Sequence, residues 1–124
     1  MAHQGKTHLT YVIIAPPDQE DEGRRIFKSH GRWMESTHHR TGEKALLSYE
    51  VSIAPELTNP MDQSSAATGN TCFVLTEIYE SEAGVADHFQ QAQSTWEEFP
   101  ALVEWLARCR MFGVPAARIT NSLW

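Results

Sequence analysis

The sequence predicts a single α+β domain in which strand and helix patterns follow in the order β-α-β-β-α-β. Short apolar or alternating runs, each bounded by proline or glycine, have the pattern of strands. Two longer segments between them carry apolar residues at helical spacing. The length of 124 residues is that of one domain. We therefore expect residues 1–124 to form one domain, with a four-stranded antiparallel sheet and the helices on one face.

The first strand and helix occupy the N-terminal third. "THLTYVII", residues 7–14, is rich in β-branched residues, and "APPD" stops it. Asp18 is a plausible helix cap, and acidic residues follow where the helix dipole favours them. The helix is expected to run to about Thr41 and to end at Gly42.

Two strands and a loop are expected in the middle of the chain. "ALLSYEVSIA", residues 45–54, alternates, and Pro55 is expected to close it. Residues 55–70 have no period and many Pro, Ser, Asn and Gly residues, which predicts a loop that is either mobile or functional. "TCFVLTEIY", residues 71–79, is predicted to be the third strand.

The C-terminal part is expected to supply the second helical layer and the last strand. Ser81 can cap a helix that reaches Trp96, and Pro100 is expected to start a second helical piece, "PALVEWLARC". "MFGVP" is expected to break that piece, and residues 116–124 to form the last strand. The complete order is that of the ferredoxin-like fold. Its uncovered sheet face would carry apolar side chains, so we expect a homodimer through this face.

Composition excludes several classes of function. The formal net charge of −6 argues against nucleic acid and anionic membranes as partners. No apolar run approaches the length of a membrane span, and "MAHQGKTH" lacks the apolar stretch of a signal peptide. Cys72 and Cys109 have no CxxC spacing and are interpreted as small buried hydrophobic residues. These features are consistent with a reducing cytoplasm.

Two stretches of the chain resemble the antibiotic biosynthesis monooxygenase family. They are "GEKALLSYEVSIAPE" and "FVLTEIYESEAGVADHF", and the matching positions of the second are Val74, Glu77, Tyr79, Glu82, Ala83 and His88. The resemblance covers roughly residues 7 to 110. It implies a dimeric α+β barrel with a pocket between sheet and helices in each subunit. Family members oxidise quinols, anthrones and similar phenols with O2 and no metal or flavin, some others bind and degrade haem, and many have no known activity. The long 55–70 segment and the chain end "MFGVPAARITNSLW" depart from the family pattern.

The segment "KSHGRWMESTHHR", residues 28–40, holds three of the six histidines. At about 100° per residue, His30 falls within the apolar stripe, beside Trp33 and Met34, whereas Glu35 and His39 fall on the opposite side. His38 falls at the edge of the stripe. The sequence Glu35-Ser36-Thr37-His38 is a lone E-x-x-H motif, and Glu35 with His39 has zinc-compatible spacing without a third ligand. We therefore expect a solvated helix face here, with no metal site and no bound cofactor.

His30 and His88 are the candidate catalytic residues. An ordinary histidine pKa of about 6.5 suits a general base near neutral pH. The alternative is that both are structural histidines, each with a satisfied hydrogen bond. The candidate substrate-binding residues are Trp33, Met34, Tyr49, Glu77 and Trp96. Packing in the core or an interface is the first interpretation of the aromatic residues Trp33, Tyr49 and Trp96. A structural ion pair or hydrogen bond is the first interpretation of Glu77, which lies in mid-strand.

Three functions remain open from the sequence. The first is a cofactor-independent oxygenase that acts on a small aromatic or polycyclic phenol or quinol, with His30 or His88 as base. The second is a dimeric barrel without catalysis that binds a small molecule or a partner. The third is a haem-binding protein with His88 or His30 as axial ligand. The chain lacks the spacing of a Ser/His/Asp triad, a P-loop or a Rossmann glycine motif, which excludes those hydrolase, nucleotide-binding and dehydrogenase classes.

Overall fold

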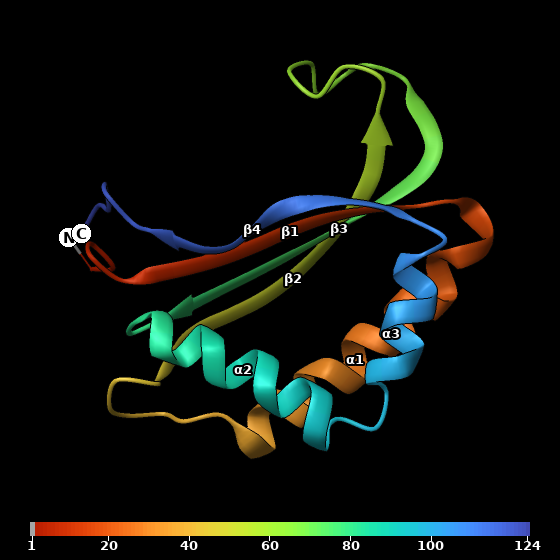
Figure 1. The fold of residues 1–124 in the computed structure, drawn as a ribbon. Helices are drawn as coiled ribbons and strands as arrows, with labels where there is room; N and C mark the ends of the chain where they lie inside the picture. Colours follow the sequence, from red (N-terminus) through yellow and green to blue (C-terminus); the bar gives the residue numbers. More distant parts are fainter. Residues whose placement is uncertain (1) are drawn as a thin grey trace.

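The computed structural model describes residues 2–124 and has the ferredoxin-like α+β fold that the sequence predicts. Four strands form one antiparallel sheet in the order β2-β3-β1-β4. The helices lie together on one face of this sheet, and the two chain ends lie side by side at one end of it (Figure 1). The strands are β1 (Thr7–Ala15), β2 (Leu46–Leu57), β3 (Ala67–Tyr79) and β4 (Arg110–Arg118), and the helices are α1 (Glu20–Thr37), α2 (Glu82–Thr95) and α3 (Phe99–Leu106).

The ends of α1 differ from the sequence expectation. A short 3-10 turn, Pro17–Gln19, precedes the helix, so Asp18 lies in this turn and Gln19 occupies the cap position without a side-chain hydrogen bond. The helix ends at Thr37, four residues before the predicted end, because His38 adopts an extended backbone. Gly42 has a φ of 85° and belongs to the turn that follows. By contrast, Ser81 caps α2 as predicted and accepts a hydrogen bond from the amide of Ala83.

Two predicted boundaries are wrong for the same physical reason, which is that β2 and β4 are the edge strands. Pro55 continues β2 and pairs with Thr71 of β3. Pro115 lies within β4, which begins at residue 110 and ends before most of the predicted strand 116–124. An edge strand tolerates proline because one side of it has no neighbour to receive the missing N–H. The loop predicted at 55–70 therefore shrinks to residues 58–66, and the β2–β3 hairpin projects beyond the sheet (Figure 1).

The core lies between the sheet and the helices. Along β3, odd-numbered residues are buried and even-numbered ones half-buried from Thr71 to Tyr79, as alternation predicts. Gly23 lets α1 approach the sheet, because a Cβ there would lie 2.4 Å from Trp105 and 2.6 Å from Phe73. The alternation of residues 45–54 predicts that Leu47 lies on the same face as Tyr49 and Val51, but Leu47 is exposed, since the register shifts between Leu46 and Ser48.

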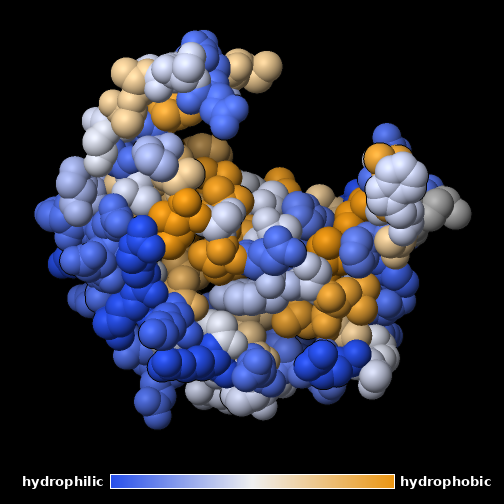
Figure 2. Space-filling view, turned by 180° about the vertical axis from the view of Figure 1, so that it is seen from behind, coloured by the Kyte–Doolittle hydropathy of each residue, from blue (hydrophilic) through white to orange (hydrophobic). Residues whose placement is uncertain are grey.

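The outer face of the sheet has no helix over it. Val12 of β1 pairs with Val74 of β3 and with Phe112 of β4, so these three side chains form one row across this face. Phe112 and Val114 are exposed, at 56% and 44%. Figure 2 shows hydrophobic atoms gathered in a concave surface between the β2–β3 hairpin and the chain ends. An apolar sheet face of this kind is the surface predicted to pair with a second copy.

Candidate functional site

The candidate site is a cavity of about 200 Å³ between the sheet and the helices. Its walls are almost entirely apolar. The polar side chains among them are Tyr11, His30 and His88. The wall residues come from all three helices and three strands: Leu9, Tyr11, Ile13, Phe27, Leu75, Phe89, Phe99, Leu102, Val103, Leu106 and Met111. Both predicted catalytic histidines therefore reach one cavity, although they are 58 positions apart in the sequence.

His30 lies on the buried stripe of α1 and is only 4% exposed. Its Nδ1 is 3.0 Å from the hydroxyl of Tyr49 on β2. Burial lowers the pKa of His30 to about 3, and the nearby His88 and His38 lower it further in the same direction. The imidazole is therefore neutral at physiological pH, and one of its nitrogens carries a lone pair.

His88, on α2, belongs to a hydrogen-bonded chain that fixes its tautomer. The Thr37 hydroxyl donates its proton to the Trp33 carbonyl, so it can only accept from His38 Nδ1 at 3.0 Å. His38 Nε2 then carries a lone pair and accepts from His88 Nδ1 at 2.8 Å. It follows that His88 Nε2 is unprotonated. Burial lowers the pKa of His88 to about 3, which keeps the ring neutral.

Glu77 of β3 lies beneath the two histidines and is fully buried. Its Oε1 accepts a hydrogen bond from the Tyr79 hydroxyl at 2.5 Å and lies 3.8 Å from His88 Nδ1. Its Oε2 has no hydrogen-bond partner among the described residues. Burial raises the pKa of Glu77 to about 7, although the Tyr79 hydrogen bond acts in the opposite direction. A buried carboxyl with a raised pKa beside a cavity is a candidate functional group.

The candidate substrate-binding residues Trp33 and Trp96 do not line this cavity. Trp33 and Trp96 stack at 5.6 Å between ring centroids, and their indole N–H groups are bonded to Thr95 and Ser29. His30 packs against Trp96 with ring centroids 5.0 Å apart. Both tryptophans pack against the His30 ring and so fix its position.

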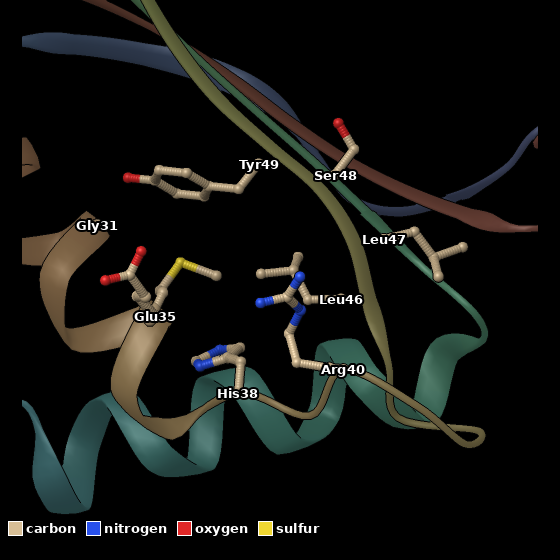
Figure 3. A pocket seen from close by; sticks show the side chains of 9 residues that line it. Gly31, Glu35, His38, Arg40, Leu46, Leu47, Ser48 and Tyr49 are labelled. Carbon is tan, nitrogen blue, oxygen red and sulfur yellow. The ribbon is translucent and has the colours of Figure 1, made fainter.

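A second cavity, of about 230 Å³, lies on the other side of the end of α1, against the start of β2. Met34 and Tyr49 line it together with four polar side chains: Glu35, His38, Arg40 and Ser48. Figure 3 shows the His38 ring at this cavity, with Arg40 and Leu46 near it and Tyr49 across from the helix. His38 therefore lies between the second cavity and His88.

His38 is the residue that helical periodicity misplaced. Extended along α1, the periodicity puts it at the edge of the apolar stripe, but the helix ends one residue earlier. Its extended backbone turns the ring inward, where it is 9% exposed and touches His88 and Trp33. Glu35 and His39 are exposed, as predicted. The sequence prediction took Gly42 as the end of the helix. It therefore missed the earlier end at Thr37, which turns His38 inward.

The two cysteines, predicted to be small buried hydrophobic residues, are unpaired and half-buried, and Cys109 packs against the core. None of the described helices is long and apolar enough to cross a bilayer.

Comparison with known proteins supports the fold alone. No protein-family profile matches the chain, and no curated protein matches it significantly in sequence. A crystal structure described as a dimeric ferredoxin-like protein from an uncultured marine organism is similar, with a TM-score of 0.59 and 11% identity. The match covers 95% of this chain and 99% of the other. The resemblance to antibiotic biosynthesis monooxygenases thus remains a hypothesis.

Proposed function

We propose that the cavity binds a small aromatic phenol or quinol and that the protein oxidises it with O2 without a bound cofactor. The observation that carries the proposal is an apolar cavity bordered by two neutral histidines, with a buried carboxyl beneath them. Such a combination of apolar walls and a few convergent polar groups is typical of ligand sites.

The volume of the cavity limits the size of the ligand that it can bind. An apolar cavity of about 150 Å³ can hold benzene, so about 200 Å³ suits one ring with substituents, or two small fused rings. Larger polycyclic phenols and a haem exceed this volume, which argues against the haem-binding alternative. The polar edge at His30 and His88 offers nitrogen atoms to a phenolic hydroxyl that enters with its ring against the apolar walls.

The chemistry requires only proton removal, desolvation and orientation. The free Nε2 of His88 accepts the hydroxyl proton. Because burial lowers the pKa of His88 to about 3, well below the ordinary 6.5 expected of a base, this step depends on the ionised Glu77, whose Oε1 lies 3.8 Å from Nδ1, to stabilise the imidazolium. The electron-rich quinol anion then reacts with O2. One oxygen atom enters the ring, the other leaves as water, and the quinol becomes a hydroxyquinone. The four electrons that O2 gains are the four that the quinol loses.

We also propose that the working unit is a homodimer that pairs through the outer sheet face. Three features support this: the apolar row from Val12 to Phe112, the concavity beside the β2–β3 hairpin, and the dimeric description of the similar structure.

Oxygen consumption tests the proposal. Untagged, chelator-treated protein is mixed with one-ring and two-ring quinols in an oxygen electrode. We expect turnover above the uncatalysed rate, reduced about 100-fold or more in His88→Gln, since general base catalysis contributes at least that factor. The matched control is His39→Gln, because His39 is an exposed histidine. Absence of turnover with every quinol would refute the oxygenase, and equal rates in wild type and His88→Gln would refute the base.

A further inference from the structure

We propose that His30, Glu77 and His88 form a binding site for one divalent transition-metal ion. One ligand atom from each of the three residues lies within 4.8 Å of the other two, and all three side chains are buried. They come from three different elements, α1, β3 and α2. Around a metal with bonds of about 2.0–2.2 Å, neighbouring ligand atoms lie about 3–3.5 Å apart. Side-chain rotations that bring the ligand atoms closer by up to about 1–2 Å are therefore needed to complete the site.

The surroundings orient these ligands in the way that metal sites require. A coordinating histidine normally donates its second N–H to a fixed partner. His88 does this through Nδ1 to His38, which leaves Nε2 free to coordinate. His30 Nδ1 lies 3.0 Å from the Tyr49 hydroxyl, which accepts a proton from it in the tautomer that leaves Nε2 free to coordinate. Tyr79 holds Oε1 of Glu77, and Oε2 is a buried acceptor without a partner among the described residues.

The charge balance of the cluster also favours a cation. Both histidines are held in the neutral form that coordinates metals, because burial lowers their pKa values. The Glu77 carboxylate carries the only formal negative charge of the three groups, and burial disfavours it. A divalent ion would compensate this charge and satisfy the unpartnered oxygen.

The ligand set selects the kind of metal. Two imidazoles with one carboxylate suit Zn²⁺, Fe²⁺, Co²⁺ or Ni²⁺, whereas Mg²⁺ and Ca²⁺ prefer oxygen ligands throughout. Three protein ligands leave at least one coordination position open, as in catalytic rather than structural sites. His30 and His88 line the apolar cavity, so this open position has a route to a small ligand.

The inference does not rest on the proposed function. A proton and a metal ion compete for His88 and Glu77, so the cofactor-free turnover proposed above would be lost when the ion binds. This site is also distinct from the Glu35–His39 pair considered from the sequence, which lies on the exposed side of α1.

The test is titration of untagged, chelator-treated protein with Co²⁺, followed by its visible d–d absorption and by calorimetry. We expect one ion per chain. Glu77→Gln and His88→Gln should each weaken binding by more than about 100-fold, and His38→Ala by about 10- to 100-fold as the loss of an outer-shell partner. The matched control, Glu35→Gln with His39→Gln, should bind as wild type does.

Circular dichroism establishes that each variant is folded. The decisive comparison is Co²⁺ binding by Glu77→Gln and by wild type, because this substitution removes a buried charge and leaves the hydrogen-bonded histidine rings in place. Absence of stoichiometric Co²⁺ binding by folded wild type would overturn the inference. So would binding that survives in Glu77→Gln and disappears in the Glu35/His39 control. Turnover of quinols by the chelated protein is a separate measurement, so the metal site and the oxygenase fail or succeed independently.

Discussion

The buried carboxyl of Glu77 makes a quantitative prediction about stability. Its folded-state pKa is raised from the ordinary 4.5 to about 7 by burial. At 1.36 kcal/mol per pKa unit, the ionised side chain reduces the free energy of unfolding by about 3 kcal/mol at alkaline pH. Because the folded pKa is the higher one, the penalty is absent below pH ~4.5, grows as the pH rises, and is complete above pH ~7.

Glu77→Gln removes this titration and keeps an acceptor for the Tyr79 hydroxyl. We expect the free energy of unfolding of the variant, relative to wild type, to increase by about 2.5 kcal/mol between pH 5 and pH 8. The quantity to compare is the difference in the free energy of unfolding between variant and wild type. Titration of His30 and His88 changes the stability of both proteins with pH in the direction opposite to Glu77, and the difference cancels this contribution. The histidines' folded pKa values of about 3 stabilise the protein above the ordinary value of 6.5, and this contribution is lost as the pH falls.

The assay is urea unfolding of both proteins in a chelating buffer at several pH values. Glu50→Gln is the control, since Glu50 is exposed on the neighbouring strand β2. A difference between Glu77→Gln and wild type that stays constant from pH 5 to pH 8 would show that folding does not raise the pKa of Glu77. That result would refute the electrostatic reasoning for the whole cluster.

Three further predictions follow from packing. Gly23→Ala should lower the free energy of unfolding by about 1–3 kcal/mol, because its Cβ would collide with Trp105; urea unfolding measures this, and an unchanged midpoint would contradict the close approach of α1. Phe112→Asp should convert the proposed dimer to a monomer in size-exclusion chromatography with light scattering, since Phe112 is exposed on the outer face; a persistent dimer would place the interface elsewhere. Tyr49→Phe should cost about 1 kcal/mol by removing the partner of His30, whereas no loss on thermal or urea unfolding would mean that this hydrogen bond contributes nothing.

Much of the candidate site could be predicted from local spacing. The helical angles placed His30 inside and Glu35 and His39 outside, as the structure has them. His88 was expected at the edge of its helix stripe and is 4% exposed. The position of Glu77 in mid-strand required a partner, which is the Tyr79 hydroxyl. Each of these residues was identified separately, because spacing along one element carries no information about a neighbour on another.

The sequence by itself determined the order of elements and the inward face of most of them, since period and capping are local properties of the chain. Tertiary structure decided which strands lie at the edge, and so why Pro55 and Pro115 continue strands. It also decided where α1 ends, and with it the inward turn of His38. The meeting of His38 with His88, and of His88 with Glu77, depends on the packing of separate elements against one sheet, which no local pattern encodes.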